Sequence, residues 1–171
     1  MGAIGQWIPW QDRQEWSQVV VSMTAAVAGL GGEVEHLREI VRQIEGWYAE
    51  LDGQLDNLGA VTCCRCTTIC CTVATVCYDL RDLLVIYLAD NRLPQQQVTR
   101  QADGTCVHLT PHGCCLNRRE RPFICTWYIC AAQKDALMGQ QHGAGSEIFA
   151  LIAKVKTARK ELENRFVDAV G

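Results

Sequence analysis

The alternation of apolar and polar residues predicts a long helix over residues 34–58. Its apolar positions follow one another at intervals of three and four: Val34, Leu37, Val41, Ile44, Tyr48, Leu51, Leu55 and Leu58. This spacing places them on one face of a helix that packs along its length against neighbours. Gly46 and Gly53 lie within it, and each costs about 1 kcal/mol relative to alanine. We expect these glycines to allow the close approach of another helix.

The same spacing predicts three further helices. The first has apolar positions at Trp16, Val20, Met23, Val27 and Leu30, followed by Gly31 and Gly32, which end it. The last has a candidate cap at Ser146 and apolar positions at Ile148, Leu151, Val155, Ala158, Leu162 and Phe166. The remaining one covers about residues 70–89, with apolar faces formed by Val73, Val76, Leu80, Leu83, Leu84, Tyr87 and Leu88.

Together these segments predict a mainly α fold. Four helices with matching apolar faces favour an antiparallel bundle, and a long two-helix coiled coil that dimerises is the alternative. The length of 171 residues fits a single domain that can form its own core without metal. We divide it into N-terminal helices over residues 1–60, a cysteine-rich region over 61–130 and a C-terminal helix within 131–171.

Residues 91–103 have a different pattern, with Pro94 and three glutamines ahead of a turn signal at Asp103 and Gly104. The segments on either side of this turn, residues 98–101 and 106–109, predict a small β-hairpin. Such a hairpin would carry Cys106 towards the other cysteines.

Charge and hydropathy narrow the classes of partner. The net charge is −3, and the one basic run, Arg118-Arg119-Glu120-Arg121, is short and interrupted by an acid. That run favours a solvated loop over an anion site, and there is no broad basic region of the kind that binds nucleic acid. No apolar stretch approaches the ~20 residues that cross a membrane. We expect no nucleic acid and no membrane, and instead a protein partner or self-association through the heptad-patterned helices.

All eleven cysteines lie between Cys63 and Cys130, and the segments on either side have none. Cysteines that serve as small core residues would be distributed over all the packed helices. Their clustering therefore favours thiolates that gather around a metal. The rival hypothesis is a secreted domain held together by disulfides.

Three features oppose the disulfide hypothesis. The number of cysteines is odd, and the first residues lack the basic and apolar regions of a signal peptide. Three pairs are vicinal, at 63–64, 70–71 and 114–115. Neighbouring Cα atoms are about 3.8 Å apart, closer than the roughly 4.4–6.8 Å of ordinary disulfides. We therefore expect a cytoplasmic protein with reduced thiols.

The spacing of the cysteines defines two sets. Cys63, Cys66 and Cys70 are about one helical turn apart, and Cys77 continues their face if the helix begins early. Cys71 points about 100° away from Cys70 on a helix, so it either ligates from irregular chain or packs in the core. The second set is more widely spaced and suits loops: Cys106, Cys115, Cys125 and Cys130. Neither set alone has the paired Cys-x2-Cys motifs of a zinc ribbon, so we expect ligands from both sets to converge.

Residues 63–130 combine several motifs in a fixed order. These are Cys63-x2-Cys66, Cys70-Cys71, Cys106-Val107-His108-Leu109, Cys115 and Arg121-Pro122-x2-Cys125-x4-Cys130. In this order of motifs the region resembles the CxxCxxCC, or YkgJ-type, family of zinc- or iron-chelating proteins. The resemblance implies a bound metal or iron–sulfur cluster and no particular reaction.

The candidate metal ligands are Cys63, Cys66, Cys70, Cys71, Cys106, Cys115, Cys125 and Cys130. The choices between Cys63 and Cys64 and between Cys114 and Cys115 stay open. Ligation by cysteine alone suits zinc or a [4Fe–4S] cluster. We favour the iron–sulfur cluster, because the thiols are numerous and come from distant loops, and zinc is the alternative. One site with several cysteines left over is the more economical hypothesis, and two sites are the other.

Side chains near the cysteines give weaker signals. Arg121 either donates hydrogen bonds to a carboxylate or to carbonyls beside an anionic thiolate centre, or lies on the surface of a rigid turn. Histidines close to a cysteine loop, such as His108 and His112, lie at the surface or in hydrogen bonds more often than they ligate metal. Asp79 and Asp82 are three residues apart on the predicted helix, and we interpret them as helix-surface charge.

Two functions from different classes follow. The first is an iron–sulfur protein that transfers electrons or supports a partner enzyme, with the helices as its docking surface. The second is a zinc-stabilised module for protein–protein interaction. An enzyme with an open iron position is a third hypothesis. We expect no independent catalytic activity, because the sequence has no phosphate-binding glycine loop, nucleophile elbow or dinucleotide fingerprint.

Overall fold

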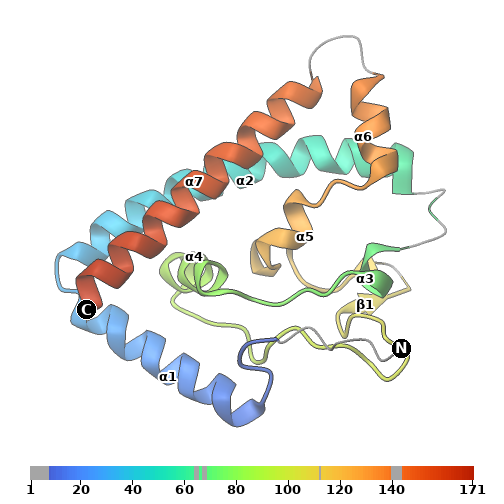
Figure 1. The fold of residues 1–171 in the computed structure, drawn as a ribbon. Helices are drawn as coiled ribbons and strands as arrows, with labels where there is room; N and C mark the ends of the chain where they lie inside the picture. The colour runs from blue at the N-terminus through green and yellow to red at the C-terminus, as the bar shows by residue number, and fades with distance from the viewer. Residues whose placement is uncertain (1–7, 64–65, 67–68, 112, 140–143) are drawn as a thin grey trace.

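Helices form most of the structure (Figure 1). The structure is a computed structural model, and it describes residues 8–63, 66, 69–111, 113–139 and 144–171. Its elements are α1 (Arg13–Gly29), α2 (Glu33–Thr62), α3 (Cys70–Val73), α4 (Leu80–Asp90), β1 (Leu109–Thr110), β2 (Gly113–Cys114), the 3₁₀ helix η2 (Arg118–Glu120), α5 (Phe123–Trp127), α6 (Ala131–Met138) and α7 (Ala144–Val170). The prediction of a mainly α protein is therefore confirmed.

The two longest helices, α2 and α7, lie side by side and run in opposite directions (Figure 1). One end of this pair is packed by Leu37, Val41 and Ile44 of α2 with Val155, Leu162 and Phe166 of α7. The other end is packed by Leu51, Leu55 and Leu58 of α2 with Ile148, Leu151 and Ile152 of α7. All the apolar positions predicted for α2 except Val34 and Tyr48 are buried.

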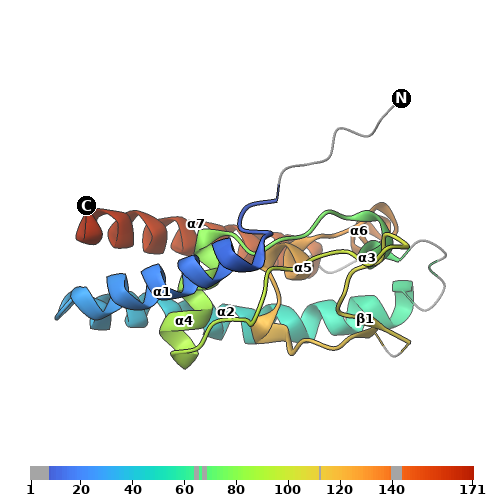
Figure 2. The same cartoon turned by 90° about the horizontal axis from the view of Figure 1, so that it is seen from below.

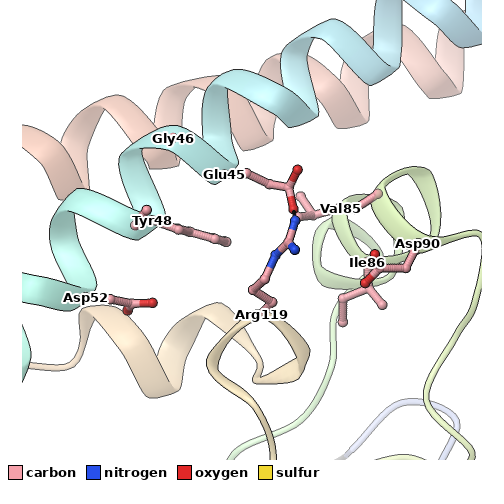
Figure 3. Close-up of a pocket in the computed structure, with 10 residues that line it drawn as sticks. Glu45, Gly46, Tyr48, Asp52, Val85, Ile86, Asp90 and Arg119 are labelled. Atoms are coloured by element: carbon pink, nitrogen blue, oxygen red, sulfur yellow. Dashed lines mark ion pairs between the residues drawn. The ribbon is translucent and has the colours of Figure 1, made fainter.

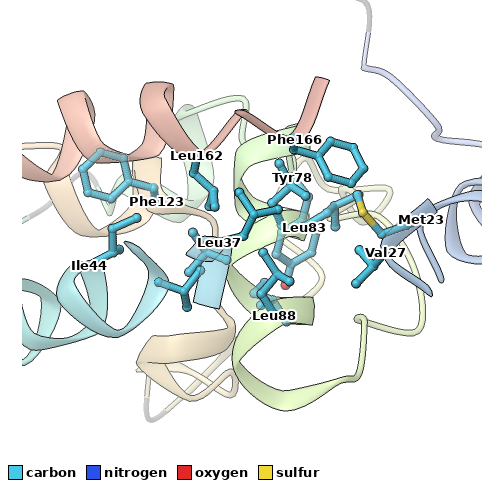
Figure 4. Packing of buried hydrophobic residues seen from close by; sticks show 14 of the residues in the cluster. Met23, Val27, Leu37, Ile44, Tyr78, Leu83, Leu88, Phe123, Leu162 and Phe166 are labelled. Atoms are coloured by element: carbon cyan, nitrogen blue, oxygen red, sulfur yellow. The ribbon is translucent and has the colours of Figure 1, made fainter. Parts of the chain in front are cut away.

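Helix α4 crosses the α2–α7 pair instead of running along it (Figure 1, Figure 2). Figure 4 shows Leu83 and Leu88 of α4 among side chains of the other helices, together with Met23 and Val27 of α1. The chain turns between α1 and α2 through a bend of 115°. The described contacts therefore show a mainly helical core built on one antiparallel pair that α4 crosses.

The prediction of one helix over residues 70–89 is wrong. Helix α3 ends at Val73, residue 74 is extended, and a new helix begins at Leu80. Asp79 starts that helix: its carboxylate accepts from the Asp82 backbone N–H at 2.8 Å, and Asp82 accepts from the Asp79 N–H at 3.1 Å. Such a capping box favours a helix start at this point. Cys77 lies in the extended segment and does not share a helix face with Cys70.

Gln97 holds this extended segment in place. Its side-chain oxygen accepts from the backbone N–H of Tyr78 at 2.7 Å, and its side-chain nitrogen donates to the Tyr78 carbonyl at 3.1 Å. These bonds satisfy backbone groups that a continuous helix would have paired internally. The break therefore depends on a contact distant in sequence.

The predicted hairpin around Gly104 is present as a turn, with a few backbone hydrogen bonds between the segments on either side of it. Gln101 donates to the Thr105 carbonyl at 2.8 Å and Val107 donates to the Thr99 carbonyl at 3.0 Å. Gly104 has a φ of +84°, which glycine adopts readily. Beyond it, β1 and β2 pair in antiparallel fashion.

Gly46 and Gly53 do not mark a close approach of helices, contrary to expectation. A Cβ atom built on either glycine meets nothing within 4 Å. Taken singly, none of the described helices is both long and apolar enough to cross a membrane, and α1 with α2 meets that test only as a bent pair.

Candidate metal centre

The end of α2 lies beside the start of α6, and α3 and β1 lie on the same side of the molecule (Figure 1, Figure 2). No disulfide joins any of the ten described cysteines. Seven of them lie at the end of α2 (Cys63), the start of α3 (Cys70, Cys71), the turn and β2 (Cys106, Cys114), in α5 (Cys125) and at the N-cap of α6 (Cys130). Segments from both predicted sets therefore meet in one region.

The first group of thiols consists of Cys63, Cys66, Cys70 and Cys130. The Cys66 backbone N–H donates to the Cys63 carbonyl at 3.1 Å. Burial raises the pKa of the Cys70 thiol, and the negative charges of Cys130, Cys63 and Cys66, in that order, raise it further. Cys63 caps the end of α2, Cys70 opens α3 and Cys130 caps the start of α6, so this group draws on three elements.

Gln133 links the two ends of this first group. Its side-chain nitrogen lies 3.8 Å from the Cys63 sulfur as a donor, and its side-chain oxygen accepts from the Cys130 backbone N–H at 3.2 Å. The end of α2 is thus joined to the start of α6 by one amide side chain. An N–H donor to sulfur stabilises the thiolate form that ligates metal.

The second group consists of Cys71, Cys106, Cys114 and Cys125. The Cys106 backbone N–H donates to the Cys71 carbonyl at 2.9 Å, so these two residues are adjacent in space. Leu109 pairs with Cys114 across β1 and β2, and its N–H donates to the Cys106 carbonyl at 3.0 Å. The hairpin therefore brings Cys106 and Cys114 together, as expected for a site closed by loops.

Cys125 completes the second group from α5. Its side chain is open to solvent on one side, yet the surrounding protein withdraws enough water to raise the pKa of its thiol to about 12. The charges of Cys114, Cys71 and Cys106 contribute to this increase after desolvation. The pKa of Cys71 is also raised, first by burial and then by Cys106 and Cys114.

Two arginines lie beside the second group. Arg100 donates to the carbonyls of Thr72 at 3.2 Å, Ala74 and Gly104, and so ties the end of α3 to the turn before Cys106. Arg121 donates to the Leu116 carbonyl at 3.0 Å. Its positive charge partly offsets the increase in the pKa of Cys71 that burial and the neighbouring thiols cause. Of the two interpretations of Arg121, a hydrogen bond to a carbonyl near the thiols is the one the geometry favours.

Cys115 and Cys77 are placed apart from these groups. The Cys115 sulfur lies 3.6 Å from His108 Nδ1, and its N–H donates to the His108 carbonyl at 2.9 Å. The charges that act on Cys125 include those of Cys114 and Cys106, and the choice between Cys114 and Cys115 as a ligand stays a prediction. Burial followed by the charges of Asp79 and Asp82 raises the pKa of Cys77. Cys64 and His112 lie outside the described residues.

The described thiols are not arranged as a complete set of metal ligands. Over the described ranges, no three His, Cys, Asp or Glu side chains are close enough together to hold a metal ion. The chemistry of both groups nevertheless suits one class of metal, since each offers only sulfur among its four members. Such soft donors suit zinc, copper(I) and iron–sulfur clusters better than magnesium or calcium.

A buried ionic network fixes α5, and with it Cys125. Asp82 accepts from the Phe123 backbone N–H at 2.8 Å and from the Arg159 guanidinium at 2.8 Å. Arg159 also donates to Asp79 at 3.0 Å and to the Tyr48 hydroxyl at 3.1 Å. The interpretation of Asp82 as surface charge is wrong, because its side chain is buried and joins α4, α5 and α7.

The basic run of η2 pairs with acids of α2. Arg118 contacts Asp52 at 3.2 Å and also Asp56, while Arg119 contacts Glu45. Figure 3 shows Arg119 reaching Glu45 across a cavity of about 460 Å³ between α2, α4 and η2. These arginines are engaged by carboxylates, so they fasten the loop before α5 to the scaffold.

Comparison with protein-family models, curated proteins and solved structures finds no match to this chain. The family resemblance therefore rests on the cysteine motifs themselves.

Proposed function

We propose that this protein binds metal through cysteine thiolates, as an iron–sulfur protein of the [4Fe–4S] type with an electron-transfer or accessory role. The observation that carries the proposal is that cysteine-bearing segments are joined across the fold: a backbone bond links Cys106 to Cys71, and Gln133 links Cys63 to Cys130. The cysteine ligands of a cluster need not be neighbours in sequence, and soft thiolates are what its iron atoms require.

The hydrophobic core supports iron–sulfur over structural zinc. Helices α1, α2, α4 and α7 bury a continuous apolar cluster that includes none of the grouped cysteines as fully buried members. Small zinc domains depend on metal for folding because they lack such a core. A scaffold that forms without metal leaves the metal available for chemistry.

The polar groups near the thiols support the proposal of a negatively charged iron–sulfur cluster. Cluster sites that carry four thiolates are negatively charged, and nearby hydrogen-bond donors and cations tune their reduction potential. Gln133 provides an amide donor at Cys63, and Arg121 provides a positive charge at Cys71. When bound, the cluster would supply one-electron redox chemistry.

The helical surface supports a protein partner. Val21 of α1 and Val167 and Val170 of α7 are large apolar side chains that remain exposed. On this proposal the helices serve as the docking surface in the cytoplasm, packed as a bundle, and the cysteine region lies at one end. The alternative is a zinc-stabilised interaction module, in which the metal only orders the cysteine loops.

Anaerobic purification followed by metal analysis and an absorption spectrum tests the proposal. We expect iron matched by acid-labile sulfide and a broad band near about 400 nm. Colourless protein with stoichiometric zinc would favour the interaction module. Protein that takes up neither zinc nor iron with sulfide after reconstitution would contradict both.

A further inference from the structure

We propose that a cavity between α4, α5 and α7 binds a small organic anion, in which a phosphate or carboxylate group is attached to an aromatic ring. The cavity has a volume of about 600 Å³, within the range of roughly 300–1,000 Å³ that is usual for sites of small molecules. None of the eight grouped cysteines is among the described residues that line it. The proposal is therefore separate from the metal centre and does not depend on it.

Four cationic side chains and two carboxylates line the cavity. The cations are Arg81, Lys156, Arg159 and Lys160, and the carboxylates are Asp79 and Asp82. This excess of positive charge is local, because the chain as a whole has a net charge of −3. A cavity with such a charge balance attracts anions.

Two of the cations are already neutralised by acids. Arg159, whose side chain is 4% exposed, donates to Asp82 at 2.8 Å and to Asp79 at 3.0 Å. Arg81 pairs with Glu163 at 2.8 Å. This ionic network forms a fixed wall of the cavity and leaves the other cations for a ligand.

Lys156 and Lys160 are the cations without such an acid. Both belong to α7 and are four residues apart, so they share a face of the helix, where like charges repel. None of the ion pairs found over the described residues includes either lysine. An anion that contacts both ammonium groups would form charge-assisted hydrogen bonds and relieve this repulsion.

Phe123 and Trp127 of α5 give the same cavity an aromatic wall. Their ring centroids are 6.4 Å apart, and the Lys156 ammonium lies 3.8 Å from the Trp127 centroid. This cation–π contact holds one of the two free charges over the aromatic surface. A ligand ring on this wall would have its charged group beside the lysines, which favours an aromatic anion over a bare inorganic one.

Calorimetric titration of the full chain with phenyl phosphate tests the site. We expect saturable binding. Inorganic phosphate lacks the ring and benzamide lacks the charge, so each should bind at least about tenfold more weakly. Absence of phenyl phosphate binding would overturn the proposal, and equal affinity for inorganic phosphate would overturn the role of the aromatic wall.

Lysine variants locate the binding. Lys156→Gln and Lys160→Gln should each weaken the binding of phenyl phosphate about tenfold, since each removes a hydrogen bond to a charged group. Lys154→Gln is the matched control, because Lys154 is exposed on the same helix but lies outside the cavity lining. Its substitution should leave the affinity unchanged. Equal losses in all three variants would reveal non-specific attraction and overturn the site.

A second measurement uses the unaltered protein and does not depend on the folding of any variant. In NMR spectra, the assigned indole signal of Trp127 should shift as phenyl phosphate saturates the chain. The indole of Trp16 is the internal control, because its N–H donates to the Pro94 carbonyl at 3.0 Å, away from this cavity. Saturable binding without a shift at Trp127 would place the anion elsewhere and contradict the proposal.

Discussion

Asp82 shows how one buried carboxylate positions a distant thiol. It lies on α4 and accepts hydrogen bonds from Phe123, at the start of α5, and from Arg159 on α7. Burial raises its pKa to about 6, against the opposing charge of Arg159. At neutral pH the pair is therefore ionised, and removal of either charge alone would leave the other buried without a partner.

The titration of Asp82 gives a prediction for stability. Its pKa is raised from 3.8 to about 6 in the folded protein, so the folded state binds this proton more tightly than the unfolded state. The resulting stability is present below the unfolded pKa and is lost as the pH rises through the folded pKa. We expect the free energy of unfolding to fall by up to about 3 kcal/mol between about pH 4 and pH 7, relative to Asp82→Asn.

Urea denaturation of both proteins across this pH range measures the effect. The comparison with Asp82→Asn removes the contributions of other carboxylates that titrate in the same interval. Parallel pH profiles for the two proteins would show that Asp82 does not titrate as burial predicts.

At the scale of elements, local patterns predict long helices well and their interruptions poorly. The intervals of three and four identified α2, because nearly all of its apolar residues face the core. The break before α4 depends on Gln97, whose partner Tyr78 is 19 residues away in sequence. Asp79 and Asp82 were a visible signal of a helix start, since a capping residue followed by an acid three positions later is a known N-terminal pattern.

The candidate site shows the same contrast between local sequence patterns and contacts distant in sequence. Clustering in sequence singled out the cysteine-bearing segments, and the Cys71–Cys106 backbone bond joins one segment of each set. Spacing alone did not reveal which thiols are neighbours, because Gln133 lies 70 residues from Cys63 and Cys106 bonds to Cys71 through the backbone.

Gly53 offers a test of helix α2 itself. A Cβ at this position meets nothing within 4 Å, so alanine adds no clash. Alanine also lowers the entropy of the unfolded chain and favours the helix. We expect Gly53→Ala to raise the free energy of unfolding by roughly 0.5–1 kcal/mol, measured by urea denaturation. Destabilisation would indicate that another helix does approach closely there.

Arg100 connects α3 to the hairpin, and its loss should weaken metal binding. Arg100→Met removes the donors to Thr72, Ala74 and Gly104, which leaves Cys71 less firmly held against Cys106. We expect a reduction in metal affinity of roughly 10–100-fold, typical for residues that orient ligands, measured by competition with a chelator. Arg92→Met is the matched control, because Arg92 is exposed and contacts the Glu120 side chain at 3.5 Å, away from α3 and the hairpin turn. Equal effects of the two substitutions would argue against this role of Arg100.

At the scale of the whole molecule, the helical core and the cysteine region depend on different interactions. The core is apolar packing among α1, α2, α4 and α7, while the cysteine region is held by hydrogen bonds, ion pairs and the proposed metal. Stability therefore differs between the two parts, and local opening is expected first in the part with less apolar contact.

Removal of the metal should affect the two parts unequally. We expect the chelated protein to keep most of its far-ultraviolet helical signal, because α2 and α7 pack without the thiols. Amide hydrogen exchange should accelerate in α3, the hairpin and α5, while α2 and α7 remain protected. Loss of the helical signal together with the metal would instead place this protein among domains that need metal to fold.

The link from Arg159 through Asp82 to α5 also has a consequence for biosynthesis. Chains grow from the amino end, and domains fold as their segments emerge. All the cysteines are synthesised before α7, yet α5 is secured only when Arg159 of α7 reaches Asp82. Cys125 thus acquires its final place in the fold only after translation has passed α7, which makes the ordering of α5 a late, post-translational step.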